Sequence, residues 1–220
     1  MSLATLRQQI EAASGPSHPV RLLAVSKLQP ATAVATLAGQ GQRAFGENYV
    51  QEAAAKIGEL AALGLQWHLI GHLQSNKAEL AAQVFDWVQT VDRAKLVGAL
   101  ARHRPAALPP LNVLIQVNID DEDSKHGCSP GQIAGLAGAI ANEPRLCLRG
   151  LMAIPAPFPE ASKRQAAFAR MQVLFTGLAA DYPQVDTLSM GMSSDFAEAI
   201  AAGSTMVRVG TALFGQRPSP

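Results

Sequence analysis

Short apolar segments rich in β-branched residues alternate along this chain with Ala-rich segments whose apolar positions recur at helical spacing. Eight segments have the length and composition of buried strands: 21–26, 43–45, 67–70, 87–91, 112–119, 148–153, 187–190 and 206–209. Helices are predicted between them, several opened by a residue suited to a helix N-terminus, with starts near Pro30, Tyr49, Ser75, Arg93, Pro130, Glu160 and Ser194. A further polar helix is predicted ahead of the first strand, over residues 2–14.

Alternating strands and helices predict a parallel sheet, because parallel neighbours need a crossover connection. Eight such repeats fit a closed (β/α)8 barrel better than an open doubly wound sheet, which usually has about five or six strands and a glycine-rich dinucleotide loop. The tail QRPSP cannot form a helix, so we expect the eighth helix to be short or absent. No linker or repeat divides the chain. Residues 1–220 are therefore expected to form a single α/β domain, a TIM-type barrel with an extra N-terminal helix.

Composition limits the classes of function. The 18 Lys and Arg residues nearly balance the 17 Asp and Glu residues, so no overall field attracts nucleic acid or an anionic membrane. No apolar run reaches the ~18 residues of a membrane span, and the opening lacks a signal-peptide pattern. Cys128 and Cys147 form no CxxC motif and are expected to be reduced thiols. We expect a cytoplasmic protein and, without an evident apolar seam, a monomer.

In a barrel of this kind the active face is built from the loops after the strands, so the residues that close each strand are the candidates. Lys27 directly follows the apolar stretch 22–25. A lysine desolvated on one side has a lowered pKa, which favours the neutral amine that forms a Schiff base with a carbonyl. The alternative is that Lys27 extends into solvent along an apolar surface.

The loops after the seventh and eighth strands contain glycines and hydroxyl residues. Gly191, Ser193 and Ser194 follow the seventh strand, and Gly210 and Thr211 follow the eighth. Such loops present backbone N–H and side-chain O–H groups to an anion, and barrels commonly hold phosphate at this place. Either loop alone could be a glycine turn with a helix cap, but two adjacent loops of the same chemistry favour a phosphate site.

Arg208 lies inside the eighth strand, where a charge is costly unless it faces a ligand or a carboxylate. The segments 45–48 and 70–77 could bring Glu47, Asn48 and further polar residues to the same mouth, although a helix start explains most of them.

A metal site is not expected. His68 and His72 are four residues apart, but that spacing does not converge two side chains when the first is in a strand, and no HExxH motif or Cys cluster is present. The remaining histidines have the sequence context of surface positions: His18, His103 and His126. A Ser-His-Asp site is not expected either, because no serine lies in a GxSxG elbow.

Seven ordered motifs carry a resemblance that spans nearly the whole chain. They are AVSK at Lys27, FGENYVQE from Phe45, WHLIGHLQSNK from Trp67, VNIDDEDSKHG from Val117, LRGLMAIP from Leu148, LSMGMSSD from Leu188 and STMVRVGTALFG from Ser204. With these motifs the chain resembles the YggS/PROSC-like pyridoxal phosphate homeostasis proteins, which are related in fold to the barrel domain of alanine racemase.

The resemblance implies that the cofactor is pyridoxal 5′-phosphate (PLP), held as a Schiff base on Lys27. It also implies that Ser193, Gly210 and Thr211 hold the phosphate. Arg208 would approach the pyridine nitrogen, and Asn48 would lie near the cofactor ring. Many relatives read SKTKP where this chain reads SKLQP, so Gln29 replaces a second lysine and leaves the exchange kinetics of the cofactor open. Lys125 matches a position where relatives often carry lysine, and a transit role for it stays a hypothesis.

The expected role is to hold and deliver PLP, with apo PLP-dependent enzymes as recipients. An arginine at the pyridine nitrogen disfavours the proton that makes PLP a strong electron sink. Racemases of this fold add a second domain and a partner's tyrosine as second base, and we expect this chain to lack that base unless Tyr49 or a loop residue substitutes. The alternatives are a PLP-dependent racemase-like or decarboxylating enzyme, and a cofactor-free aldolase that uses Lys27 on a sugar phosphate.

Overall fold

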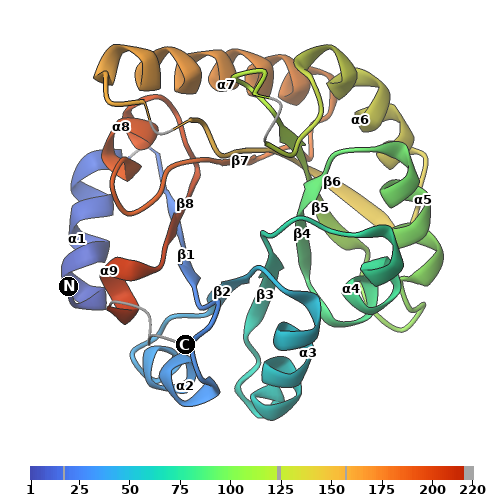
Figure 1. Ribbon diagram of the computed structural model, residues 1–220, viewed down its shortest axis with the longest axis horizontal. Helices are drawn as coiled ribbons and strands as arrows, with labels where there is room; N and C mark the ends of the chain where they lie inside the picture. Colours follow the sequence, from blue (N-terminus) through green and yellow to red (C-terminus); the bar gives the residue numbers. More distant parts are fainter. Residues whose placement is uncertain (17, 123–124, 157, 216–220) are drawn as a thin grey trace.

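Eight parallel strands form one closed barrel, in which each strand pairs with the next along the chain and the last pairs with the first (Figure 1). A computed structural model describes residues 1–16, 18–122, 125–156 and 158–215. The strands are β1 (Arg21–Val25), β2 (Ala44–Glu47), β3 (Gln66–Leu69), β4 (Trp87–Val91), β5 (Leu111–Val117), β6 (Leu146–Ala153), β7 (Thr187–Ser189) and β8 (Met206–Val209). The predicted (β/α)8 barrel is therefore confirmed.

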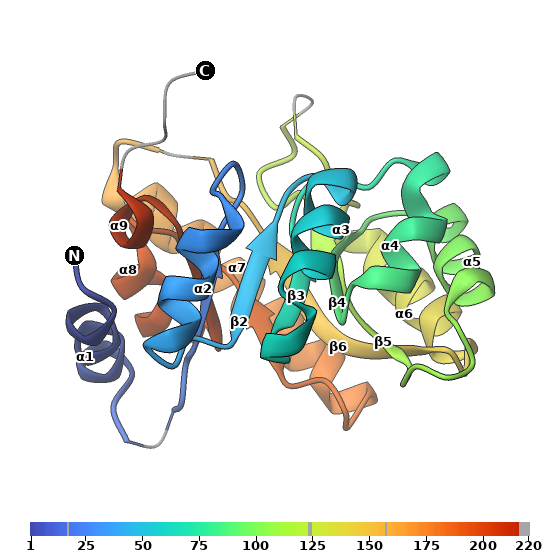
Figure 2. The ribbon, with the colours of Figure 1, turned by 90° about the horizontal axis from the view of Figure 1, so that it is seen from below.

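Helices form a ring outside the strands (Figures 1 and 2). They are α1 (Leu3–Ser14), α2 (Ala31–Gly39), α3 (Val50–Glu59), α4 (Ala78–Val84), α5 (Ala94–His103), α6 (Ile133–Ala141), α7 (Ala161–Asp181), α8 (Phe196–Ala201) and α9 (Thr211–Phe214). The short 3-10 helices are η1 (Ala61–Leu63), η2 (Ser75–Lys77) and η3 (Pro130–Gln132). The eighth helix of the barrel, α9, has 4 residues, which confirms the expectation of a short one.

Two of the expected helices begin at the predicted residue as a 3-10 turn, and a third begins later than predicted. The helices expected near 75 and 130 start as η2 and η3. A capping box between Ser129 and Gln132 stabilises the N-terminus of η3. The helix expected near 194 starts at Phe196, because the N–H groups of Asp195 and Phe196 both donate to the carbonyl of Met192 and form a turn first.

The N-terminal helix α1 covers the part of the barrel wall that the short α9 leaves open. Its buried side chains Leu6 and Ile10 form one apolar cluster with Ile200, Val207 and Val209 from α8 and β8. Figure 2 shows α1, α8 and α9 on the same side of the barrel. The two ends of the chain therefore close the barrel wall together.

Most of the apolar core lies between strands and helices, and a separate cluster of Trp87, Leu114 and Met152 joins β4, β5 and β6. Trp87 stacks on the buried ring of His68, with the ring centroids 5.0 Å apart. No helix in the described ranges is both long and apolar enough to span a bilayer.

Candidate functional site

The strand register brings the candidate residues to the carboxyl-terminal mouth of the barrel. Val25 of β1 pairs with Gly46 of β2, and Ala24 pairs with Val209 of β8. Lys27 and Asn48 therefore follow two neighbouring strand ends, and Gly210 and Thr211 follow the third.

Lys27 lines a cleft together with Gly210, Thr211 and Gln29. Lys27 itself is half-buried. A Cβ atom at Gly210 would lie 3.1 Å from the carbonyl oxygen of Val25, so a larger residue would crowd the cleft beside the lysine. The structure thus brings the predicted attachment lysine and one predicted phosphate loop into the same cleft.

The backbone on both sides of Lys27 is held by hydrogen bonds. Ser26 donates its N–H to the carbonyl of Gly46 at 2.9 Å, and Leu28 donates its N–H to Glu52 Oε1 at 2.7 Å. Leu28 has a φ of 61°, in the left-handed region that non-glycine residues rarely adopt. Lys27 is therefore presented from a strained turn that the surrounding contacts fix in place.

A buried ion pair supports this turn, and the sequence did not reveal it. Lys56 of α3 is 5% exposed and Glu47 is fully buried, with Lys56 Nζ 2.6 Å from Glu47 Oε1. Lys56 Nζ also donates to the carbonyl of Ser26 at 2.9 Å, and Ser26 Oγ donates to Glu47 Oε1 at 2.6 Å. In the sequence Lys56 forms an i,i+4 pair with Glu52, a pattern typical of an exposed helix face.

The carboxylate of Glu47 has one oxygen left over. Its Oε2 is buried and has no hydrogen-bond partner among the described residues. Burial raises the pKa of Glu47, and the hydrogen bonds from Lys56 and Ser26 offset part of that rise. The turn that carries Lys27 thus rests on a carboxylate with free hydrogen-bonding capacity.

Arg208 is 4% exposed and is held by oxygen atoms of two neighbouring strands. It donates to the carbonyl and the hydroxyl of Ser189, each at 2.8 Å, and to the carbonyl of Ala153 at 2.8 Å. Burial lowers its pKa to about 10, so the guanidinium stays charged at neutral pH. Within the described part of the chain no carboxylate lies within ion-pair distance of Arg208.

A chain of hydrogen bonds runs from Arg208 through the barrel interior. Ser189 Oγ donates to Gln89 Oε1 at 2.7 Å, Gln89 Nε2 lies 3.0 Å from His68 Nδ1, and His68 Nε2 lies 3.0 Å from Gln66 Oε1. Burial lowers the pKa of His68 well below its usual value, so the ring is neutral. Every contact is satisfied if Nδ1 accepts from Gln89 and Nε2 donates to Gln66. His68 is thus a buried hydrogen-bonding residue of the barrel interior.

The loop after β7 lies against the end of β8, because Arg208 donates its N–H to the carbonyl of Gly191 at 3.0 Å. Gly191 has a φ of 92°, and a Cβ there would lie 2.6 Å from Cβ of Ala199, so only glycine fits. Ser193 is exposed on the following turn. It does not line the cleft of Lys27.

Asn48 lines a second cleft, with Tyr49, His72 and Lys77 among its neighbours. Its carbonyl is packed against Gly71, where a Cβ would lie 2.1 Å from that oxygen. Lys125 lies farther along the mouth, where its Nζ is 3.2 Å from Glu122 Oε2 and donates to the carbonyl of Ile154 at 3.3 Å.

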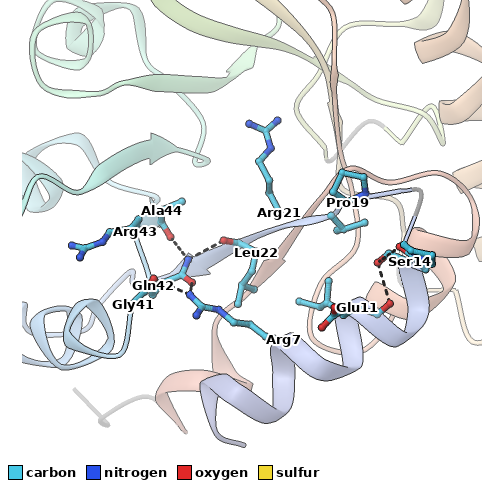
Figure 3. A pocket seen from close by; sticks show the side chains of 14 residues that line it. Arg7, Glu11, Ser14, Pro19, Arg21, Leu22, Gly41, Gln42, Arg43 and Ala44 are labelled. Atoms are coloured by element: carbon cyan, nitrogen blue, oxygen red, sulfur yellow. Dashed lines mark hydrogen bonds between the residues drawn. The ribbon is translucent and has the colours of Figure 1, made fainter.

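A hollow at the opposite end of the barrel separates α1 from the start of β1 (Figure 3). Arg7 crosses it and donates to the carbonyl of Gly41 at 2.9 Å and to Gln42 Oε1 at 3.2 Å. Arg21, which also lines the hollow, donates to Thr187 Oγ1 on β7. These arginines connect structural elements, far from the strand ends that present Lys27.

The barrel, with a lysine after its first strand and small and hydroxyl residues after its last, is of the alanine racemase N-terminal domain class. The family model described as alanine racemase, N-terminal domain, matches residues 1–218. Within that class the chain belongs to the pyridoxal phosphate homeostasis protein family. It is 54% identical over 223 aligned residues to the pyridoxal phosphate homeostasis protein of Escherichia coli (strain K12), covering 98% of this chain and 95% of that one. The Pseudomonas aeruginosa protein of the same name is 51% identical, over 97% and 92%.

Solved structures agree with this placement. PipY of Synechococcus elongatus without PLP is 40% identical and superposes with a TM-score of 0.88 over 97% of this chain and 98% of that chain. PipY with PLP bound gives a TM-score of 0.85 at the same identity and coverage. Alanine racemase from Corynebacterium glutamicum shares the fold, with a TM-score of 0.67 at 19% identity over 100% of this chain and 63% of the racemase. The family resemblance of the seven motifs is therefore confirmed.

Proposed function

We propose that this chain binds PLP covalently at Nζ of Lys27 and serves intracellular vitamin B6 homeostasis by holding and delivering the cofactor. The observation that carries the proposal is the cleft shared by Lys27, Gly210 and Thr211, with charged Arg208 in the adjoining strand. The E. coli relative is named a pyridoxal phosphate homeostasis protein, and PipY has a structure with PLP bound. The cofactor supplies an aldehyde carbon for the neutral lysine amine to attack.

The side chains present suit this cofactor. We infer that Gly210 and Thr211 bind the phosphate inside the cleft of Lys27, and that Ser193 reaches it from the exposed loop after β7. The missing side chain at Gly210 leaves room beside Lys27. Asn48 is assigned to the edge of the ring, since it follows the strand next to that of Lys27. Arg208 is assigned to the pyridine nitrogen, because a buried guanidinium that donates to carbonyl and hydroxyl oxygens has further N–H groups for a ring nitrogen.

A carrier role follows from the charge at Arg208. A guanidinium with a pKa of about 10 remains positive at neutral pH, which keeps a proton off a pyridine nitrogen beside it and weakens the cofactor as an electron sink. The chain then stores PLP instead of using it for amino-acid chemistry. We further infer that residues 1–220 act as one domain and a cytoplasmic monomer, with apo PLP-dependent enzymes as recipients.

The proposal is tested by absorbance and mass spectrometry on protein incubated with PLP. We expect a visible band that borohydride reduction removes, with a matching mass increase on the peptide that contains Lys27. Lys27→Ala should abolish the band, whereas Lys95→Ala, an exposed lysine on α5, should retain it. Unchanged PLP affinity in Lys27→Ala would overturn the assignment.

A second experiment separates carrier from enzyme. Holo-protein is mixed with a panel of L-amino acids and, separately, with an apo PLP-dependent enzyme. The carrier role predicts no enantiomer exchange and activation of the apo enzyme. Racemisation or decarboxylation that Lys27→Ala abolishes would contradict it and favour the enzyme alternative.

A further inference from the structure

Three metal-ligating side chains from consecutive strand-loop connections meet at the rim of the barrel mouth. His72 follows β3, Asp92 follows β4, and His126 lies on the connection from β5 to α6. One ligand atom from each lies within 4.8 Å of those of the other two. We propose that His72, Asp92 and His126 form a binding site for Zn²⁺ or a similar borderline divalent transition ion.

The two imidazole rings already lie against each other beside the carboxylate. Their centroids are 3.6 Å apart with an angle of 15° between the planes, and His72 Nδ1 is 3.9 Å from Asp92 Oδ2. Donor atoms in a tetrahedral zinc site are about 3.3–3.6 Å apart, given bonds of about 2.0–2.2 Å. Because parallel rings direct their lone pairs into separate planes, one ring must rotate to bind the same ion. His72 and His126 are exposed, so that rotation meets little resistance.

The backbone around His72 is fixed by its neighbours, so binding an ion there costs little backbone conformational entropy. Gly71 is packed against the Asn48 carbonyl, and its own carbonyl accepts a hydrogen bond from Thr90 Oγ1 at 2.9 Å. The next residue, Leu73, is fully buried. His72 is thus an exposed side chain between two immobile neighbours.

The backbone at His126 is fixed in a similar way. Its carbonyl accepts from Gln116 Nε2 at 3.2 Å. Gly127, with a φ of 124°, lies so close to Asn118 that a Cβ would be 2.6 Å from its N atom. Asp92 comes directly after the fully buried Val91. Exposed His72 and His126 side chains on fixed backbones can therefore adjust to bind an ion without rearranging the loops.

The local charges leave suitable ligand atoms available. Asp92 Oδ1 is engaged by Arg93 at 2.5 Å, while Oδ2 faces His72. His72 and His126 are exposed, so each ring can turn a nitrogen lone pair toward an ion. Cys128 is buried and does not belong to the cluster, which leaves a nitrogen and oxygen donor set.

This donor set selects the class of ion. Two imidazoles and one carboxylate suit zinc and its neighbours in the transition series, whereas Mg²⁺ and Ca²⁺ prefer oxygen ligands. Three protein ligands leave at least one position for water or another oxygen ligand. His72 also lines the cleft of Asn48 and Lys77, so an exchangeable ligand would lie at the mouth where the cofactor is proposed to bind.

The test uses the full chain without an affinity tag, titrated with zinc chloride against a chromogenic chelator, with and without PLP. We expect one equivalent to bind, and each of His72→Ala, Asp92→Asn and His126→Ala to weaken affinity by about tenfold or more. His103→Ala, which removes a histidine from the end of α5, is the matched control and should bind as the wild type. Zinc should also shift the ring nitrogen resonances of two of the five histidines.

Three results would overturn the site, two from the titration of the whole set and one from a single variant. One is the absence of saturable binding at equimolar zinc. The other is equal affinity in all four variants, which would place any bound ion elsewhere. Circular dichroism of each variant separates loss of a ligand from loss of the fold, and a ligand variant that keeps wild-type affinity while folded counts against the proposal. PLP binding in the same variants is read separately, so failure of the metal site leaves the cofactor assignment intact.

Discussion

Single polar side chains decide the geometry around Lys27. Glu47 and Lys56 are buried together beneath the turn, and Lys56 donates to the carbonyl of the residue that precedes Lys27. Removing the carboxylate of Glu47 would leave the buried Lys56 with only the partly exposed Glu52 as a counter-charge. The stability of this turn therefore depends on a buried ion pair that does not involve the cofactor.

We expect Glu47→Gln to lower the free energy of unfolding by up to about 3 kcal/mol, since the buried Lys56 loses its fully buried carboxylate and retains only the partly exposed Glu52. Glu52→Gln is the matched control, because Glu52 pairs with the same lysine but is 28% exposed, and its loss should cost less than about 1 kcal/mol. Urea unfolding followed by circular dichroism measures both. An equal loss of unfolding free energy in the two variants would show that the buried pair stabilises the fold no more than the exposed one.

At the scale of elements, the alternating pattern predicts every strand, and most bounds differ by no more than two residues. Apolar runs and helix starts depend on neighbouring residues, so they can be predicted from the sequence. Irregularities in strand pairing depend on contacts between residues far apart in the chain, so they cannot. The register shift between β5 and β6 at Val113 and Leu114 accompanies Gly150, whose close neighbour is the carbonyl of Thr187 on a third strand. Nothing near Gly150 in the sequence indicates that contact.

Gly150→Ala is expected to destabilise the barrel by about 3 kcal/mol, because φ is 142° there and a Cβ would lie 1.9 Å from the Thr187 carbonyl oxygen. Gly138→Ala serves as control, since that glycine is inside α6 with nothing within 4 Å of an added Cβ, and the change should stabilise by about 0.5–1 kcal/mol. Thermal and urea unfolding of both variants measure whether stability falls in Gly150→Ala and rises in Gly138→Ala. A tolerated alanine at 150 would contradict the packing argument.

For the whole molecule, the barrel assembles contacts from residues that are far apart in the chain. The sequence indicates that Lys27, Gly210 and Arg208 share one mouth, because each closes or lies in a barrel strand. It does not indicate that Arg208 is held by Ser189 and Ala153, nor that His72 meets His126, because those contacts need the closed barrel. The hydrogen-bonded polar groups that run from Arg208 to His68 also come from different strands, so they meet only once the barrel is closed.

Stability should fall as the pH drops from 7 to 5, and His68 should supply much of the slope. Its folded pKa lies well below the value of about 6.5 in the unfolded chain, so below pH 6.5 the unfolded state binds a proton that the folded state does not. The cost is at most about 1.4 kcal/mol per pH unit for this group. Urea midpoints of the wild type and His68→Gln should diverge below pH 6.5 and run parallel above pH 7, with His72 leaving a smaller residual slope. Parallel curves throughout would refute the role of His68.

The packing of α1 has a consequence for how the protein is made. Leu6 and Ile10 are synthesised before any strand of the barrel, whereas their partners Ile200, Val207 and Val209 belong to α8 and to the last strand. The apolar face of α1 stays exposed until β8 has been synthesised, and the wall between β8 and β1 cannot close earlier. Nascent chains of this protein therefore present a binding surface to chaperones until β8 has left the ribosome. A product that stops before residue 206 would retain two open sheet edges and be prone to aggregation.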